Sequence, residues 1–564
     1  MVTVEKHWNR PETDSTTVNR LCSELDCHPL VATILANRGI EDVRLARRTL
    51  APTLEDLHDP SRLPGLESAV NRIHTAIDSG ETISVYGDRD IDGVAGTALL
   101  LSVFQDIDAT VGYHIRGKWD SFGLDSDTVG DLADRGTDLL ITVDCGTNDH
   151  DGIAVADAFG MDVIVTDHHP VNRTVPQCIA CLNPRREDST YPNDGLSGTG
   201  TAYKLGEGII DRFERIDRGL YRAAALPLVA VATVADRAPL TIENRSLVHA
   251  GYERLEECPQ PGLREAVSYC GVQSIRDIGW ALAPLLNAAQ EAESGHLMLQ
   301  LLLATDSDRI DSLLETLEEY RSRRQAERSD WYQQFESALS RQADPTDEDL
   351  LVVETDGYVG GAPGRIADRL RKPVIWYYPT DDGYRCQFDS ETNIAPTELI
   401  ESCENGIKEI WGHPDAPRFS VSERALDTVV ERIETELHRN YSTEELRPQL
   451  PIDATFEATA INQTLIDHLE RLRPFGTGFD TPLFLIKGTE IGEVERFGNH
   501  DEHVALIPND AVYRCVWWTG STAWDEMTDD ARYDIVGSLS WDTYRETVSV
   551  SVKDMAIHDD EPQC

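Results

Sequence analysis

The chain has 564 residues, of which 40% are hydrophobic, and a formal net charge of −49 at neutral pH. This length exceeds the size at which a single hydrophobic core stops growing, so several domains are expected. The sequence contains no run of about 20 uncharged apolar residues and no apolar N-terminal segment. These features argue against a membrane span and a secretory signal, and we expect a cytoplasmic protein.

The acidic residues are spread along the whole chain rather than gathered in a tail. Asp and Glu together number 100, whereas Lys and Arg together number 51, and only seven of these are Lys. Even spreading with scarce Lys is typical of a surface adapted to molar salt, where charge repulsion is screened within about 3 Å. An acidic surface that binds a basic partner is the alternative interpretation.

The chain begins with a helical region with breaks, predicted over residues 1–60. From residue 66 the pattern changes, because 66–79 predicts an amphipathic helix that ends at Gly80. Short apolar strands are then predicted at 82–87, 139–144 and 162–167, with helices between them. This alternation predicts a parallel α/β sheet that is covered on both faces, in a first domain over 61–300.

Three further parts are predicted after this domain. Residues 301–345 are charged and lack Gly and Pro until Pro345, which favours a connecting helix. Residues 346–450 repeat an α/β pattern and predict a second, smaller domain. Residues 451–564 are rich in β-branched and aromatic residues between turns, which suits a small β-barrel.

Acidic side chains follow each predicted strand of the first domain, the position at which open α/β sheets place their ligand sites. The residues at these strand ends are Asp88, Asp90, Asp92, Asp144, Asp167, His168 and His169. An Asp-rich turn that caps the next helix is the alternative for the first three. A calcium EF-hand is excluded, because its twelfth position would be Leu99 instead of Glu.

A fourth acidic position, Asp236, ends an apolar, helix-like run. Hard oxygen ligands mixed with imidazole suit Mn²⁺ or Mg²⁺ better than structural zinc. Two such ions a few Å apart can clamp a phosphate and generate hydroxide from water near neutral pH. The pattern therefore indicates a two-metal centre that hydrolyses a phosphodiester.

Taken in order, these motifs resemble the DHH phosphoesterases, and within them the RecJ-type single-strand exonucleases. The resemblance covers nearly the whole chain and includes GDRDIDGVAGTALL, LLITVDCG, VIVTDHHP, LSGTGTAYKL, LVAVATVADRAPL, GGAPGRIADRLRKPVIW and RPFGTGFDTPLF. It implies a DHH domain, a connecting helix, a second α/β domain called DHHA1, and a C-terminal OB-like barrel. Together with the acidic surface, it points to a halophilic archaeal source.

The resemblance also implies roles in catalysis. The implied metal ligands are Asp88, Asp90, Asp92, Asp144, His168 and Asp236. Asp90 would bind one of two divalent cations, with Mn²⁺ preferred over Mg²⁺. Asp92 and Asp236 would bind the other, and Asp144 would bridge the two. His169 would contact the scissile phosphate, and Asp167 would support the ligands from behind.

Further residues are implied to bind the strand: Asn287, Gly364, Arg365, His413, Trp517 and Trp518. The two tryptophans would stack on bases, and barrel core is the alternative for each. The family usually reads close to PRINAAGR where residues 284–291 here read PLLNAAQE, so both arginines are lost. This departure leaves the polarity and the choice between DNA and RNA open.

The expected activity is metal-dependent hydrolysis of single-stranded DNA in the 5′ to 3′ direction, in repair, recombination or replication. A replication-associated subunit with little nuclease activity is the alternative. Its partners would be GINS and the replicative helicase, or a single-strand-binding protein. The complete ligand set favours the enzyme, and the OB-like domain argues against a small-molecule phosphodiesterase.

Overall fold

The computed structural model describes residues 7–558 apart from 122, 173, 214–215, 293–294, 343–347, 371, 391–393, 404–405, 414–415, 447–448, 499–500, 510–512, 519, 526, 528–530 and 543. The chain divides into two compact units, which are described separately. One comprises Arg44–Arg323 and Arg471–Thr481, and is called the sheet unit. The other comprises Met1–Val43, Arg324–Glu470 and Pro482–Cys564.

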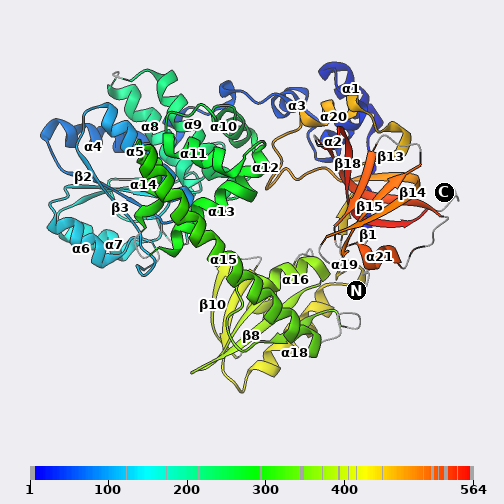
Figure 1. The fold of residues 1–564 in the computed structure, drawn as a ribbon. Coiled ribbons are helices and arrows are strands. Elements are labelled where there is room, and N and C mark those ends of the chain that lie inside the picture. The colour runs from blue at the N-terminus through cyan, green and yellow to red at the C-terminus, as the bar shows by residue number, and fades with distance from the viewer. Residues whose placement is uncertain are drawn as a thin grey trace. The chain divides into compact units, whose positions relative to one another are not determined.

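The sheet unit is built on five parallel strands in the order β3-β2-β4-β5-β6 (Figure 1). The strands are β2 (Ile83–Gly87), β3 (Val111–Ile115), β4 (Leu139–Val143), β5 (Asp162–Thr166) and β6 (Ala180–Leu182). Every residue of β2 and β4 is buried. Such continuous burial is expected of strands in a parallel sheet that is covered on both faces, as their apolar sequences predict. The predicted fold class is confirmed for this unit.

Helices cover both faces of this sheet (Figure 1). One face packs against a large core formed with α4 (Leu66–Ser79), α5 (Ile91–Asp106), α8 (Gly198–Phe213), α9 (Arg218–Ala235), α10 (Ile242–Tyr252), α11 (Pro261–Cys270) and α14 (His296–Leu303). The other face packs against α6 (Ser126–Asp134) and α7 (His150–Ala158). Short turns α12 (Ile275–Asp277) and α13 (Ala283–Leu286) precede α14. As predicted, α4 ends at Gly80, whose φ of +68° suits glycine.

Helix α15 (Ser307–Gln342) is a single helix of 36 residues, which confirms the predicted connecting helix. Apolar residues of its first half, such as Leu313 and Leu317, join the core of the sheet unit. In its second half, Phe335 and Leu339 join a core of the second α/β lobe. Among the described residues, one helix, α9, is long and apolar enough to cross a membrane, and more than half of it is buried in the core.

The second α/β lobe has a five-stranded mixed sheet in the order β10-β11-β9-β8-β7. Its strands are β7 (Leu351–Glu354), β8 (Val374–Thr380), β9 (Gly383–Asp389), β10 (Ile407–His413) and β11 (Ala416–Val421). One face packs on α17 (Pro396–Glu401) and α18 (Leu426–Asn440). The other packs, at β7 and β8, on α15 and α16 (Ala362–Leu370).

The C-terminal part forms a closed barrel, because β14 pairs with both β15 and β17. Its strands are β14 (Phe484–Phe497), β15 (His503–Pro508), β16 (Tyr513–Trp517), β17 (Arg532–Asp542) and β18 (Thr547–Ile557), with β13 (Ala454–Glu457) added beside β14. A barrel of this size matches the predicted OB-like domain. The same unit contains α1 (Ser15–Leu25), α2 (Pro29–Asn37), α20 (Gln463–Glu470), α21 (Ser521–Asp525) and the strand pair β1 (His7–Asn9) with β12 (Gln449–Pro451).

Candidate metal centre

The parallel strands of the sheet unit end at one level, so the residues that follow them form a row. The backbone N–H groups of Asp88, Asp144 and Asp167 each donate to the last carbonyl of the neighbouring strand, at 3.1, 2.9 and 3.0 Å. β2 and β4 are adjacent in the sheet. The strand that follows β2 in the chain, β3, lies towards one edge of the sheet, and the strand that follows β4, β5, lies towards the other edge. Ligands of open α/β sheets bind at such a switch point, above the carboxyl ends of the strands.

The N-termini of two helices hold the next acidic side chains. Asp90 caps α5 and accepts from the N–H groups of Asp92 and Gly93, at 3.0 and 3.2 Å. Asp92 is fully buried and accepts from the N–H groups of Gly198 and Thr199 in α8, at 2.6 and 2.8 Å. The positive ends of both helix dipoles therefore stabilise carboxylates. The capping alternative for Asp90 holds, and Asp90 still lies within the acidic cluster.

His168 lies at the centre of the acidic side chains. Its Nε2 is 3.1 Å from Oδ1 of Asp144, 3.7 Å from Oδ2 of Asp92 and 3.8 Å from Oδ2 of Asp236. Asp236 follows the last residue of α9, as the apolar run predicts. Oδ1 of Asp144 is buried and makes no hydrogen bond with the described residues, although His168 is close. A buried oxygen without such a partner suits a cation ligand.

Among the residues that the structure describes, three sets of donor atoms lie close enough to hold an ion, with all atoms of each set within 4.8 Å of one another. The sets are Asp88, Asp90 and Asp144; Asp92, His168 and Asp236; and Asp144, His168 and His169. The structure therefore brings all six predicted ligands together. A donor set of five carboxylates and one imidazole, with His169 beside it, fits hard divalent cations such as Mn²⁺ or Mg²⁺.

The electrostatics of these carboxylates also favour cation binding. Burial, followed by repulsion from neighbouring carboxylates, raises the pKa of Asp90 to about 6 and that of Asp236 to about 8. The same causes raise the pKa of Asp144 well above its ordinary value. Buried carboxylates this close together do not all ionise unless positive charge compensates them. Two divalent cations would supply that charge.

Asp167 holds His169 in place. Its buried carboxylate accepts from Nδ1 of His169 at 2.7 Å and from the N–H groups of Thr147, His168 and His169. Burial opposes ionisation of Asp167, but these hydrogen bonds outweigh it and keep its pKa well below the ordinary value. Burial likewise lowers the pKa of His169, but the bond to Asp167 and nearby carboxylates raise it to about 9. In the metal-free protein His169 is therefore a cation at neutral pH. Its side chain is 38% exposed.

The sequence patterns did not reveal two further residues of the row. Arg116 follows β3, is buried, and donates through Nε to Oδ1 of Asp88. Asn183 follows β6 and donates through Nδ2 to Oγ1 of Thr147 and to the carbonyl of His169, both at 2.9 Å. A position directly after a strand is the signal that would mark both residues, but the sequence pattern predicts neither β3 nor β6.

Asn287 lies beside the N-terminus of α5 in the sheet unit. Its Oδ1 accepts from the N–H of Ile91 at 3.0 Å, so it braces the first turn of α5. The two positions where the family usually has arginines differ in environment. Leu285 is fully buried, whereas Glu291 pairs with Lys118 at 2.8 Å.

The other predicted strand-binding residues lie in the second unit. Gly364 and Arg365 are in α16, and the guanidinium of Arg365 lies 5.0 Å from the ring centroid of Tyr332. His413 ends β10, and its side chain lies outside the described part of the structure. Trp517 is buried in the barrel, whereas Trp518 is 56% exposed.

Comparisons with known proteins match two parts of the chain to families. Residues 82–233 match the DHH family, N-terminal domain, and residues 452–554 match the RecJ OB domain. A single-stranded-DNA-specific exonuclease RecJ of Bacillus subtilis is 28% identical over 574 residues, covering 99% of this chain and 72% of that protein. The protein of the same name from Escherichia coli is 28% identical, covering 81% of this chain and 83% of its own length.

Solved structures show the same fold. RecJ from Thermus thermophilus in complex with Mn²⁺ superposes with a TM-score of 0.79 at 24% identity, covering 99% of this chain and 80% of that one. A second structure, an exonuclease RecJ bound to manganese, gives a TM-score of 0.55 at 28% identity. It covers 67% of this chain and 95% of its own length.

Proposed function

We propose that this chain, a RecJ-type protein of the DHH family, is a metal-dependent exonuclease that acts on single-stranded DNA. Its relatives are named single-stranded-DNA-specific exonucleases. The observation that carries the proposal is the buried Oδ1 of Asp144, which lies among three overlapping sets of donor atoms at the sheet's switch point.

The donor geometry supports a division of ligands between two cations. Asp88, Asp90 and Asp144 would hold one, and Asp92, His168 and Asp236 the other, with Asp144 near enough to both groups to bridge them. When bound, two such cations polarise the phosphate and lower the pKa of water to a value near neutrality. Mn²⁺ and Mg²⁺ are the proposed ions, and relatives have been solved with each.

His169 has a separate role in the proposal. Asp167 fixes its ring through Nδ1 and keeps it protonated, as the raised pKa of about 9 indicates. An oriented cation at the edge of the site stabilises the charge that develops on a phosphate in the transition state. His169 would therefore contact the scissile phosphate, while Asp167 positions it and touches no substrate.

The test is hydrolysis of end-labelled single-stranded DNA and RNA at molar KCl with Mn²⁺. Asp144→Ala and His168→Ala should each abolish product, because both remove a donor from the cluster. Asp151→Ala, which removes an exposed carboxylate of α7, is the matched control and should retain activity. The label position reports the polarity, which we propose to be 5′ to 3′. An inactive wild type, or active ligand variants, would refute the assignment.

The choice of partners is a separate proposal that only the family resemblance supports. It names GINS, the replicative helicase or a single-strand-binding protein, in cytoplasmic DNA repair, recombination or replication. Co-purification of the full chain with each purified candidate at molar KCl tests it. The non-catalytic alternative predicts such a complex together with no hydrolysis by the wild type.

A further inference from the structure

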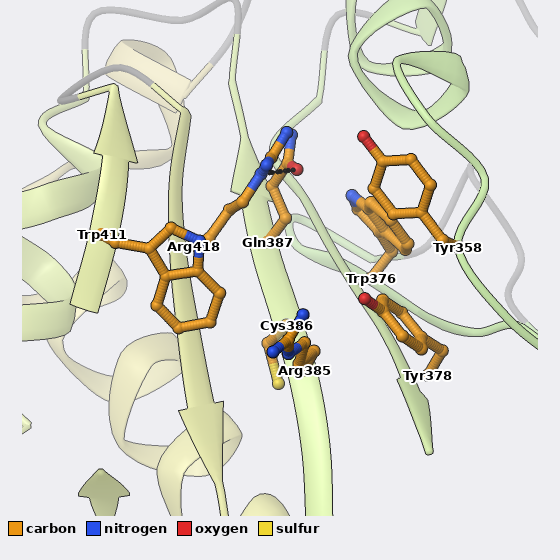
Figure 2. Close-up of a pocket in the computed structure, with 8 residues that line it drawn as sticks. All are labelled: Tyr358, Trp376, Tyr378, Arg385, Cys386, Gln387, Trp411 and Arg418. Atoms are coloured by element: carbon orange, nitrogen blue, oxygen red, sulfur yellow. Dashed lines mark hydrogen bonds between the residues drawn. The ribbon is translucent and has the colours of Figure 1, made fainter. Parts of the chain in front are cut away.

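A row of large polar and aromatic side chains crosses the sheet of the second α/β lobe. The strand register places Trp376 of β8 opposite Gln387 of β9, Gln387 opposite Arg418 of β11, and Arg418 opposite Trp411 of β10. Directly opposed residues lie on the same face of a sheet. Residues from four strands, far apart in sequence, are thereby aligned on one face (Figure 2).

This row lies on the face that helices cover only in part. Alternate residues of the same strands, Cys386, Phe388 and Phe419, belong to the core on the opposite face, with α17 and α18. On the face of the row, the core contributed by α15 and α16 includes residues of β7 and β8 but none of β9, β10 or β11. Of the row's side chains on those strands, Arg418 is exposed and Trp411 is half-buried, whereas Gln387 is buried.

A cavity of about 230 Å³ is found at this face. Its lining residues are Tyr358, Trp376, Tyr378, Arg385, Cys386, Gln387, Trp411 and Arg418. They include four aromatic side chains and two arginines but no carboxylate, in a chain with a net charge of −49. Figure 2 shows Trp411 on one side of the cavity and the group of Tyr358, Trp376 and Tyr378 on the other.

Buried hydrogen bonds fix the polar side chains of this cavity. Asp389, which is buried, accepts from Nε2 of Gln387 at 2.9 Å and from Nε1 of Trp376 at 3.1 Å. With its amide nitrogen directed to Asp389, Gln387 presents Oε1 to Nε of Arg418 at 3.0 Å. Gln387 is only 8% exposed, so Arg418 is held by a buried partner rather than by a surface contact.

The aromatic rings and guanidinium groups are placed side by side. The guanidinium of Arg385 lies 5.8 Å from the ring centroid of Trp411, and that of Arg418 lies 5.9 Å from that of Tyr358. Trp376 and Tyr378 are stacked, with centroids 5.8 Å apart and planes at 24°. Flat apolar faces next to fixed cations suit a ligand that carries both a flat ring and an anion, which is the chemistry of a nucleotide.

We propose that this cavity binds one nucleotide of a single strand. Trp411 and Tyr378 supply stacking faces for the base, and Arg385 and Arg418 contact its phosphate. The volume is below the ~300–1,000 Å³ usual for sites of drug-sized ligands, which favours one base over several. That the strand is single-stranded DNA rests on the proposed function. The second lobe would bind this strand by base stacking as well as by phosphate contacts.

The test measures binding of the full chain without divalent cations, so that hydrolysis does not intervene. Three fluorescent probes or competitors are compared at 1 M KCl: a twelve-residue oligothymidine, an abasic strand of equal length, and free thymidine monophosphate. We expect the wild type to bind oligothymidine more tightly than the abasic strand. Trp411→Ala should weaken oligothymidine binding about 5- to 100-fold, in the range of one lost stacking contact, and leave abasic binding unchanged.

Matched variants separate stacking from damage to the lobe. Trp411→Phe retains an aromatic face and should keep most of the affinity, whereas Tyr378→Ala should behave like Trp411→Ala. Arg418→Ala should weaken both strands, and Arg424→Ala, which removes an exposed arginine outside the lining, should weaken neither. Oligothymidine binding by Trp411→Ala and Tyr378→Ala at the wild-type level would overturn the inference.

The remaining outcomes also decide the matter. Displacement of the strand by equimolar thymidine monophosphate from the wild type, but not from Trp411→Ala, would assign the cavity to a free nucleotide and overturn strand binding. Hydrolysis is measured separately with Mn²⁺. A wild type that binds as expected but does not hydrolyse DNA would refute the proposed function and leave the inference standing. The reverse result would refute the inference alone.

Discussion

Gly198 and Asp144 meet so closely that no larger residue fits at position 198. A Cβ built on Gly198 would lie 2.7 Å from the Cβ of Asp144, a separation that real Cβ atoms essentially never show. The N–H of Gly198 also donates to the carboxylate of Asp92 at 2.6 Å. The first residue of α8 thus contacts two of the proposed metal ligands, and its lack of a side chain lets the helix N-terminus approach them.

Gly198→Ala should therefore impair the centre. The added methyl group must displace Asp144 or the end of α8, and a shift of about 1 Å in an active site costs about 100-fold in rate. We expect kcat to fall by about this factor. Gly200→Ala, two residues further along the same helix, is the control, because its Cβ would approach no neighbouring atom closer than 3.4 Å. Equal kcat in the two variants would contradict the argument.

The stability of the metal-free fold should depend on pH through the pair of Asp167 and His169. The pKa of His169 is raised to about 9, so its charged form contributes stability that is complete below its unfolded value of about 6.5. That contribution is lost as pH rises through about 9. In metal-free protein the Tm of Asp167→Asn should lie below that of the wild type at pH 6, and the gap should narrow by pH 9.5.

The measured quantity is the difference in Tm between the wild type and Asp167→Asn, because Asp236 also titrates between pH 6 and pH 9.5. Its raised pKa of about 8 makes the metal-free fold less stable as pH rises towards that value, and this decline is present in both proteins although His169 modulates it. Thermal unfolding at pH 6, 7.5 and 9.5 in a chelator supplies the data. A gap that widens towards pH 9.5 would be the wrong sign for a His169–Asp167 ion pair.

Much of the site follows from the sequence because it depends on local signals. Each acidic residue comes directly after a short apolar strand, and parallel strands bring their carboxyl ends to one edge. Asp144 and Asp167 could therefore be grouped without coordinates. Arg116 could not, because only the last residue of β3, Ile115, is fully buried, and β3 lacks the apolar run that marks β2 and β4.

The cavity of the second lobe could not be predicted for a different reason. It depends on which residues of four strands oppose one another, and a shift of one residue would turn each side chain to the other face. Trp411 and Arg418 are paired by a register that the sequence does not specify. The barrel shows the same limit, since the β-branched and aromatic residues of 451–564 predict strands but not the pairing of those strands.

Metal binding should stabilise the fold more at higher pH. Ligands must lose their protons to bind a cation, and the pKa of Asp90 is raised to about 6 and that of Asp236 to about 8. Saturating Mn²⁺ at about 100 times its Kd stabilises a protein by about 2.7 kcal/mol. We expect the Tm increase with Mn²⁺ to grow from pH 5.5 to pH 8.5 in the wild type and to vanish in Asp144→Asn. Asp151→Asn should retain it, and a pH-independent increase would contradict the ligand assignment.

Strand affinity should depend only weakly on salt. Each phosphate contact contributes a slope of about −0.7 in log affinity against log salt for single strands. If Arg385 and Arg418 together neutralise one phosphate and supply the main contacts, a tenfold rise in KCl should weaken binding by about 5-fold. A titration of oligothymidine from 0.2 to 2 M KCl measures the slope, which Arg418→Ala should reduce. A much steeper slope would show that many other cations contact the strand.

The two adjacent tryptophans of the barrel should respond oppositely to substitution. Trp517 is 7% exposed, and its ring packs against Gly520, so Trp517→Ala should cost about 3–5 kcal/mol of stability, as for a large buried side chain. Trp518 is 56% exposed, and its ring contacts His503 at a centroid distance of 5.0 Å. Trp518→Ala should leave the Tm of the barrel nearly unchanged.

Strand binding should depend on Trp518 more than on Trp517. An exposed ring beside other aromatic rings offers a stacking face worth about 1–3 kcal/mol per base. Trp518→Ala should therefore raise the Kd for oligothymidine by about 5-fold or more, while Trp518→Phe restores most of the affinity. Urea unfolding and fluorescence anisotropy on the same samples separate the two effects. If Trp518→Ala binds as tightly as the wild type, the barrel holds the strand without this ring, and the cavity of the second lobe becomes the main stacking site.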